Sequence, residues 1–373
     1  MSSAAKEEQP ATPEQRPLCL DGLSARSNVL LIGNFLSAQG MYGVCEALAE
    51  RLTQAGHRVL HSSSKPNAAG RLLDMLSTAW QERRSYDVAQ VDVFSGRAFL
   101  QAEAVCATLR LANKPYVLTL HGGNLPAFAL QWPRRVHNLL QSAAAVTVPS
   151  RYLLEQMRPY HDGLRLLPNP LAVDAYAFKL RCVARPRLIW LRAFHELYNP
   201  LLALQVVASL VTDFPDIQLT MIGPDKGDGS LPNAQRIAAE LGLGDRVTLA
   251  GPIPKAEVAA SLNEADVFLN TTSVDNVPIS VLEAMASGLC IVSTNAGGIP
   301  YLLEHGRDAL LVPSNDIDEM SQAVRRILTE PALAARLSEA ARKKAEQYDW
   351  SNILPEWESL LANESRRDQL NQE

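Results

Sequence analysis

Residues 273–288 read Ser273-Val-Asp-Asn-Val-Pro-Ile-Ser-Val-Leu-Glu-Ala-Met-Ala-Ser-Gly288 and lie between two short apolar runs. Short apolar runs are typical of buried strands, so the segment between them is predicted to be a loop that leads into a helix. Asn276 suits the N-cap, Pro278 is tolerated in the first turn, and Gly288 suits the end of the helix. The free amides and the positive dipole end of such a helix favour a phosphate.

Two carboxylates frame the start of this helix, Asp275 just before it and Glu283 within it. At about 1.5 Å rise per residue, Glu283 is expected roughly 8 Å along the helix from its start. That is about the span of a diphosphate with a sugar at each end. One acid could meet a transferred sugar and the other a ribose, with the helix amides holding the phosphates between them.

Short apolar runs alternate with helical stretches along most of the chain, which predicts an α/β fold with doubly wound sheets. The series restarts after a Pro-containing connection, so two successive sheets with a cleft between them are expected. The predicted strands are 28–33, 57–61, 87–94, 115–120, 144–148, 164–167, 187–191, 217–222, 247–249, 265–269, 290–293 and 309–312. The predicted domains are a disordered leader at 1–27, a first domain at 28–178 and a second domain at 179–348.

The composition is that of a globular protein of 373 residues, with 47% hydrophobic and 20% charged residues. A formal net charge of −5 argues against a broad nucleic-acid-binding surface. The five cysteines are far apart and none has CxxC spacing, so neither a zinc cluster nor a disulfide framework is expected. No run approaches the ~18 apolar residues of a membrane span, and the leader has no apolar core. A cytoplasmic protein is therefore expected.

The stretch from Asp275 through Glu283-Ala-Met-Ala-Ser-Gly288, followed by Thr294-Asn-Ala-Gly-Gly-Ile-Pro300, resembles the donor-site signature of family-4 retaining glycosyltransferases of GT-B fold. The usual signature has Glu at both acid positions, and this chain has Asp at the first. The resemblance implies two Rossmann-like domains facing a cleft, with the last helix, 349–373, crossing back to the first domain. It also implies transfer of a sugar from a nucleoside-diphosphate sugar, with a UDP-sugar favoured, to a hydroxyl of a saccharide, lipid-linked or small-molecule acceptor.

The same resemblance implies a role for each residue of the stretch. Glu283 would hold the ribose hydroxyls, and Asp275 would contact the sugar hydroxyls. Neither a metal nor a cofactor is implied, since the donor itself is a substrate. Further donor contacts are implied for Asn276, Val277, Pro278 and Ile279 beside the phosphates, and for Gly251 and Pro252 beside the base.

Arg192 ends the first predicted strand of the second domain, where the family has Arg, four residues, then Lys, with both cations on the diphosphate. Leu197 stands at the Lys position here, and a one-residue slip would put Tyr198 there as an uncharged hydrogen-bond donor. Arg192 would stabilise charge on the leaving nucleotide. A surface salt bridge is the other interpretation of Arg192.

His121 follows the predicted strand 115–120 and precedes two glycines that allow close approach. A lone histidine is often structural, but the family has a histidine in a similar Leu-His-Gly context near the transferred sugar. His121 is therefore predicted to bond the sugar or the acceptor. Gly40 lies in a loop that in the family approaches the donor phosphate, although an ordinary turn explains this loop equally well.

Two other functions remain open on the sequence. One is a catalytically silent GT-B protein that binds a nucleotide sugar or scaffolds a partner, which Leu197 and Asp275 would favour. The other is a nucleotide-sugar epimerase or hydrolase on the same fold. Trp132, Arg135 and Arg151 form a small basic-aromatic patch that could make weak peripheral contact with anionic lipid, but a solvated face is the favoured interpretation.

Overall fold

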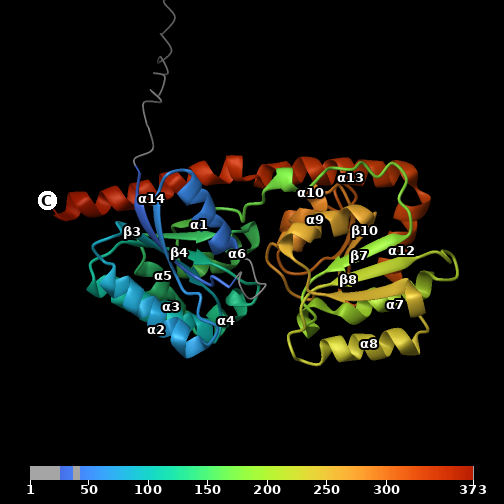
Figure 1. Ribbon diagram of the computed structural model, residues 1–373, viewed down its shortest axis with the longest axis horizontal. Coiled ribbons are helices and arrows are strands. Elements are labelled where there is room, and N and C mark those ends of the chain that lie inside the picture. The colour runs from blue at the N-terminus through green and yellow to red at the C-terminus, as the bar shows by residue number, and fades with distance from the viewer. Residues whose placement is uncertain (1–25, 37–42, 373) are drawn as a thin grey trace, which may run out of the picture.

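The computed structural model describes residues 26–36 and 43–372, and it contains two six-stranded parallel sheets (Figure 1). The first sheet has the order β2-β1-β3-β4-β5-β6. Its strands are β1 Asn28–Ile32, β2 Arg58–Ser62, β3 Val88–Val93, β4 Tyr116–Leu120, β5 Ala145–Val148 and β6 Leu164–Leu166. The strand order of the first sheet reverses at β1, which lies between β2 and β3. Val29 is in register with Val59 of β2 on one side and with Val88 of β3 on the other.

The second sheet has the order β12-β11-β10-β7-β8-β9, with its first and fourth strands adjacent. Its strands are β7 Arg187–Leu191, β8 Gln218–Ile222, β9 Val247–Gly251, β10 Val267–Asn270, β11 Cys290–Thr294 and β12 Leu310–Val312. Every predicted strand is present, and no end differs from its prediction by more than two residues. The predicted α/β fold with two doubly wound parallel sheets is therefore confirmed.

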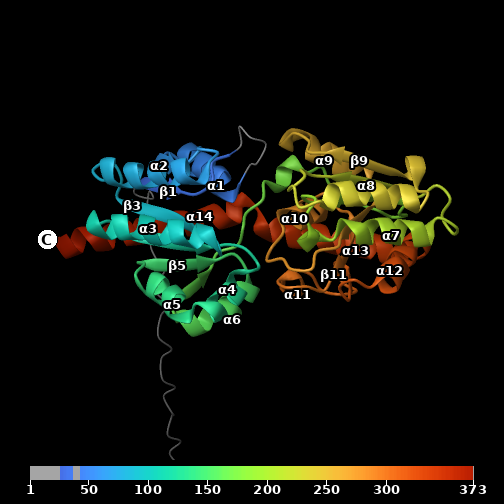
Figure 2. The same ribbon diagram turned by 90° about the horizontal axis from the view of Figure 1, so that it is seen from below.

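Helices cover both faces of each sheet (Figure 2). In the first domain they are α1 Val44–Gln54, α2 Ala68–Gln81, α3 Arg97–Leu111, α4 Leu125–Gln131, α5 Pro133–Gln141 and α6 Arg151–Met157. In the second they are α7 Pro200–Leu210, α8 Ser230–Glu240, α9 Lys255–Glu264, α10 Ile279–Ala286, α11 Ile299–Leu302, α12 Ile317–Thr329 and α13 Pro331–Ala345. Strands buried on both faces have to be apolar throughout, which explains why they appear in the sequence as continuous apolar runs.

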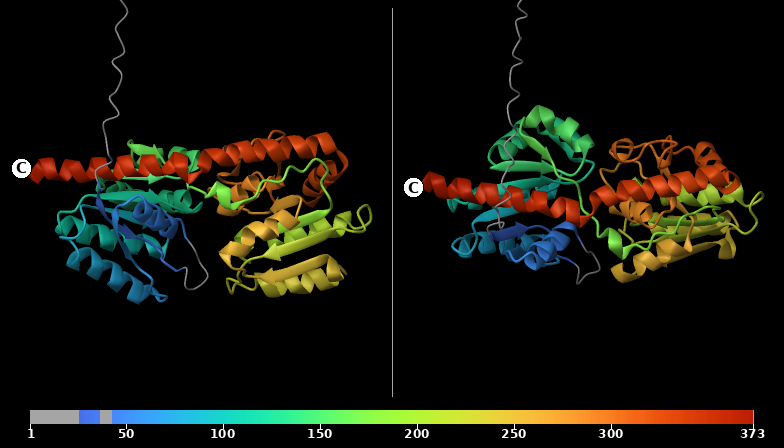
Figure 3. Two further views of the ribbon diagram at one scale, coloured as in Figure 1. Left: turned by 45° about the horizontal axis from the view of Figure 1, so that its top comes forward. Right: turned by 90° about the horizontal axis from the view of Figure 1, so that it is seen from above.

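The last helix, α14 (Trp350–Gln372), runs from the second domain along the first (Figure 3). Its residues Trp350 and Trp357 are buried in the same hydrophobic cluster as Val29 and Leu31 of β1. The chain therefore crosses between the domains twice. The two crossing segments lie side by side, because the amide of Leu171 in the first donates to Tyr348 O, just before the second, at 2.8 Å.

Candidate functional site

The strand order of the second sheet reverses between β7 and β10. These strands are neighbours in the sheet although two strands separate them in the chain. Ligands of open parallel sheets bind beyond the carboxyl ends of the strands at such a point. Arg192 directly follows β7, and Asp275 lies in the loop after β10. The fold thus brings these two predicted residues to the place where a ligand is expected.

Arg192 forms an ion pair with Asp275 through Nη2 and Oδ2. Its guanidinium carbon also lies 4.1 Å from the centre of the Tyr198 ring. The Arg192 and Asp275 side chains are 16% and 13% exposed, so the pair borders solvent but is largely covered. Tyr198 thus meets Arg192 with the face of its ring, a cation–π contact that fixes the plane of the guanidinium.

Two consecutive glycines hold the loop that carries Asp275. The amide of Gly298 donates to Asp275 O at 2.8 Å. A Cβ atom on Gly298 would lie 2.1 Å from Asn276 O, and one on Gly297 would lie 2.3 Å from Asp275 O. Gly297 also has a φ of +57°, which favours glycine. The Gly-Gly pair after β11 is therefore required for the backbone of the acidic loop to approach this closely.

Glu283 lies in the middle of α10 with its side chain 4% exposed. Its Oε1 accepts a hydrogen bond of 2.8 Å from the Tyr176 hydroxyl and also pairs with Nζ of Lys255. Burial first, and the nearby Glu283 carboxylate second, raise the pKa of Tyr176 far above its usual value, so this hydroxyl keeps its proton and donates. The predicted ribose-binding carboxylate is thus held by two donors from other elements.

The predicted start of α10 is wrong. The helix begins at Ile279 with Pro278 at the N-cap position, and no side chain caps it. The Asn276 side chain is instead within hydrogen-bonding distance of Ser150 Oγ in the first domain. Glu283 therefore lies about 6 Å, not 8 Å, from the helix start. The amides of Val281 and Leu282 donate to Pro278 O at 3.1 and 3.3 Å, so only the amides of Ile279 and Ser280 have no preceding carbonyl within the helix.

His121 is 9% exposed and lies directly after β4. Its Nε2 is 2.9 Å from Asp92 Oδ1, and its ring stacks on Phe94 with 5.0 Å between centres. An ionised carboxylate only accepts, so this bond requires the proton on Nε2 and leaves Nδ1 of a neutral ring as an acceptor. Gln90 also donates to Asp92 at 2.8 Å, which fixes the carboxylate that orients His121.

The loop after His121 touches the acidic loop of the second domain. A Cβ atom on Gly123 would lie 3.0 Å from the carbonyl carbon of Asp275 and 3.0 Å from Val274 Cγ1. The Ser150–Asn276 contact joins the domains beside it. His121, Arg192 and Asp275 thus lie in loops at one junction between the two sheets, and Glu283 lies on the helix that follows.

The remaining predicted residues are distributed as follows. Leu197 has a side chain that is 43% exposed, and its carbonyl accepts from the Ser273 amide at 2.7 Å. Gly251 is the last residue of β9 and has a φ of +69°, and its carbonyl accepts from the Gly223 amide at 2.9 Å. Pro252 follows it, in the connection that leads to α9. Val277 is buried in the core of the second domain. Gly40 lies outside the described residues.

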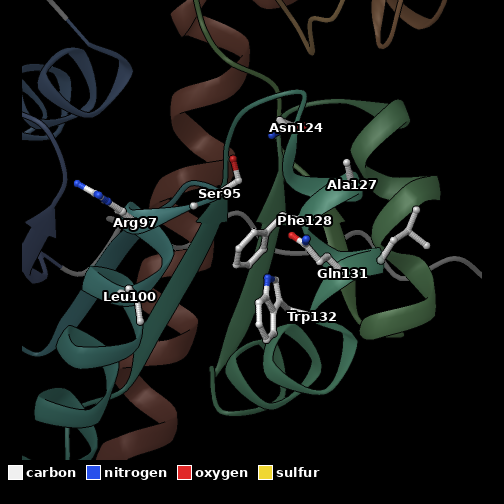
Figure 4. A pocket seen from close by; sticks show the side chains of 10 residues that line it. Ser95, Arg97, Leu100, Asn124, Ala127, Phe128, Gln131 and Trp132 are labelled. Atoms are coloured by element: carbon white, nitrogen blue, oxygen red, sulfur yellow. The ribbon is translucent and has the colours of Figure 1, made fainter.

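A groove of about 890 Å³ opens in the first domain, and its lining includes Asn124 from the loop that follows His121. Figure 4 shows Phe128 and Trp132 at its centre, with Leu100 on α3 across from them. Ser95 directly follows Phe94, and Asn124 is three residues after His121, so one end of the groove starts at the His121 loop. The lining residues are Ser95, Gly96, Arg97, Leu100, Asn124, Ala127, Phe128, Leu130, Gln131 and Trp132.

Two members of the predicted basic-aromatic patch, Arg135 and Trp132, make different contacts in the structure. Arg135 makes two hydrogen bonds with Glu103, one of them 2.6 Å long, and it lies over Phe99. Trp132, which is 49% exposed, belongs to the groove instead. Among the described residues no helix is long and apolar enough to cross a membrane.

Three residues of the site escaped the sequence analysis. Asp92 had a signal, since it is a polar residue near the carboxyl end of an otherwise apolar strand. Tyr176 and Lys255 had none, because they lie 107 and 28 residues from Glu283 and share no motif with it.

Known proteins resemble this chain in sequence and in fold. Residues 183–344 match the family model of glycosyl transferases group 1. An uncharacterized glycosyltransferase of Haemophilus influenzae is 29% identical over 160 residues, which are 42% of this chain and 44% of that protein. A D-inositol 3-phosphate glycosyltransferase of Pseudarthrobacter chlorophenolicus is 25% identical over 77% of this chain and 74% of its own length. The chain thus spans less than half the length of the Haemophilus relative.

Solved structures share the fold over nearly the whole chain. HepE of Anabaena in complex with UDP and glucose superposes with a TM-score of 0.74 at 16% identity, covering 91% of this chain and all of that one. Sucrose-phosphate synthase of Thermosynechococcus elongatus superposes with a TM-score of 0.72 at 19% identity, covering 90% and 98%. The resemblance predicted from the sequence is confirmed at this level: residues 183–344 carry the glycosyl transferases group 1 domain, and the chain has the fold of GT-B glycosyltransferases.

Proposed function

We propose that this protein is a retaining glycosyltransferase that moves a sugar from a nucleoside-diphosphate sugar to a hydroxyl of an acceptor, with a UDP-sugar as the favoured donor. The observation that carries the proposal is the grouping of Arg192, Asp275 and Glu283 around the start of α10, at the switch point of the second sheet. A GDP-sugar is the second donor class, because one relative is a GDP-mannose-dependent mannosyltransferase of Mycolicibacterium smegmatis, 28% identical over 238 residues.

In the proposed complex the diphosphate meets the positive end of α10 and Arg192. Arg192 is paired with Asp275 in the structure, so the diphosphate replaces Asp275 as its partner and leaves that carboxylate to accept from sugar hydroxyls. The guanidinium keeps its orientation during this exchange because Tyr198 lies under it. Arg192 and the positive end of α10 then stabilise the charge that builds on the leaving diphosphate.

The reaction proposed here keeps the configuration at the anomeric carbon. The bond between that carbon and the phosphate oxygen breaks, and the electron pair leaves with the nucleoside diphosphate. The acceptor oxygen attacks the same face of the oxocarbenium-like sugar, and its proton passes to the leaving phosphate oxygen. His121, held by Asp92, presents Nδ1 as an acceptor for a hydroxyl of the sugar or of the acceptor.

The groove beside His121 suits the acceptor. It starts at the loop that touches Asp275 and combines aromatic faces with amide and hydroxyl groups. Aromatic faces pack on the apolar face of a sugar ring, and planar polar side chains bond its hydroxyls. A saccharide acceptor lying along Phe128 and Trp132 is therefore the acceptor class that we favour.

A donor screen tests the function. Release of nucleoside diphosphate is measured from UDP-, GDP- and ADP-sugars, with wild type, Glu283→Ala and Glu304→Ala. Glu304 is the matched control, because its side chain is 59% exposed in the same domain and pairs only with the nearby Arg307 among the described residues. We expect slow release from one donor class by wild type and by Glu304→Ala, and loss of release in Glu283→Ala.

The screen also separates the other functions. A nucleotide that raises the Tm of wild type but is never released, with or without saccharides, would favour a protein that binds nucleotide sugar without transferring it. Release of free sugar at a rate that no saccharide increases would favour a hydrolase, and a changed sugar still on its nucleotide would favour an epimerase. Neither release nor a Tm shift with any nucleotide would contradict the donor site.

A further inference from the structure

The carboxylate of Glu283 is engaged on one side only. Tyr176 and Lys255 both bind Oε1, and no partner of Oε2 occurs within residues 26–36 and 43–372. Two donors on one oxygen fix the rotation of the carboxylate about its last bond, because a turn would break both contacts. The other oxygen is then the one left to accept from a ligand.

Of these two donors, Tyr176 is the better fixed. Tyr176 is 5% exposed, whereas the Lys255 side chain is 47% exposed. The carbonyl of Tyr176 accepts from Nη1 of Arg342 at 3.1 Å, and the same nitrogen donates to Ala286 O, in the last turn of α10, at 2.8 Å. Arg342 thus links the backbone of Tyr176 to α10, the helix that carries Glu283. This link fixes the position of the Tyr176 hydroxyl relative to the Glu283 carboxylate.

The surroundings leave room for a ligand next to this contact. A cavity of about 520 Å³ lies at the junction of the domains, and Tyr176, Lys255 and Ile279 are among the residues that line it. Its other walls come from α1, from the connection at 170–175 and from Trp350. Glu283 does not itself line this cavity, and it adjoins the space through Tyr176, which sets the orientation of its carboxylate.

We propose that Tyr176 is a positioning residue for recognition of the donor's ribose: it orients Glu283 so that Oε2 accepts from a ribose hydroxyl. This inference rests on the proposed function, since it requires Glu283 to meet the ribose. Tyr176 itself does not touch the ribose. Its loss should therefore weaken the distinction between ribose and 2′-deoxyribose, without removing the binding of the diphosphate at Arg192 and α10.

The test compares the dissociation constants of UDP and 2′-deoxy-UDP, and of GDP and 2′-deoxy-GDP, by calorimetry. Tyr176→Phe keeps the ring and removes only the hydroxyl. Tyr348→Phe is the matched control, because Tyr348 packs against the same core and has no contact with Glu283 among the described residues. We expect Tyr176→Phe to reduce the preference for ribose by roughly fivefold, which is about what one hydrogen bond contributes, and Tyr348→Phe to leave it unchanged.

The outcomes distinguish this inference from the function on which it rests. If Glu283→Ala abolishes the ribose preference but Tyr176→Phe keeps it, the donor site stands and the role of Tyr176 is refuted. Equal losses in Tyr176→Phe and Tyr348→Phe would also refute it, because they would reflect core packing. If wild type binds no nucleotide, both the function and the inference fall. A loss of the ribose preference in Tyr176→Phe but not in Tyr348→Phe supports the inference.

Discussion

Gly298→Ala tests whether the close contact between Gly298 and the acidic loop, which carries Asp275 and Asn276, is needed for activity. Gly298→Ala adds one methyl group at a position that has no positive φ, so the change is steric only. The new Cβ would lie 2.1 Å from Asn276 O and 2.9 Å from the carbonyl carbon of the same residue. Ordinary contacts begin at roughly 3.4 Å, so the loop carrying Asp275 and Asn276 has to move by about 1 Å.

A displacement of this size has a defined cost. Moving catalytic groups by about 1 Å can lower the rate about 100-fold, which corresponds to about 2.7 kcal/mol of transition-state stabilisation. Overpacking also lowers the free energy of unfolding by about 1–3 kcal/mol. We therefore expect Gly298→Ala to remain folded with a lower Tm, and to lose about 100-fold in kcat/KM for nucleoside-diphosphate release.

Gly163→Ala is the control for this prediction. Its Cβ would meet only the half-buried His161 ring, at 3.1 Å from Cε1, and a side chain can move away more readily than backbone. Rates are measured with the donor that the screen selects, and unfolding is followed by circular dichroism. Gly298→Ala with the kcat/KM of wild type would refute the reasoning, because it would mean that the loop can shift without moving Asp275 relative to the donor.

Three further predictions concern the core, the groove and the thiols. Asp266→Asn should lower the free energy of unfolding, measured in urea, by about 3–5 kcal/mol, because it leaves the fully buried Arg181 without its carboxylate; an unchanged midpoint would contradict this. Trp132→Ala should raise the KM for a saccharide acceptor several-fold, from about 0.5–1.5 kcal/mol of lost ring packing, and leave donor hydrolysis unchanged; a parallel fall in hydrolysis would place the effect outside the acceptor groove. Burial raises the pKa of Cys106 to about 12, so at pH 8 it should resist iodoacetamide in the folded protein while the exposed Cys182 reacts, as peptide mass spectrometry would show; early labelling of Cys106 would refute its burial.

The elements that the sequence predicted well are those with a local physical cause. Each strand is buried on both faces, so its apolar run is visible in the sequence without any knowledge of its neighbours. The end of α10 at Gly288 was also visible, because a φ of +73° favours glycine there. The helix start was mispredicted for the opposite reason. Asn276 has the chemistry of an N-cap, but its side chain lies against Ser150 of the other domain.

The candidate site divides in the same way. The motif around Asp275 and Glu283 marked the second domain, since its residues lie within one loop and one helix. His121 and Arg192 were found because each ends a predicted strand, and parallel strands bring their carboxyl ends to one edge of a sheet. The partners of these residues were hidden, because Tyr176 and Lys255 reach Glu283 from a different connection and a different helix.

By itself the sequence determined two α/β sheets, their strands and the motif at the centre of the second domain, since burial and turn chemistry are local properties of the chain. The pairing of groups in the site depends on the tertiary structure: Arg192 pairs with Asp275, His121 with Asp92, and Glu283 with Tyr176 and Lys255. These contacts join residues far apart in sequence, and they depend on strand order and domain packing, which no local pattern encodes.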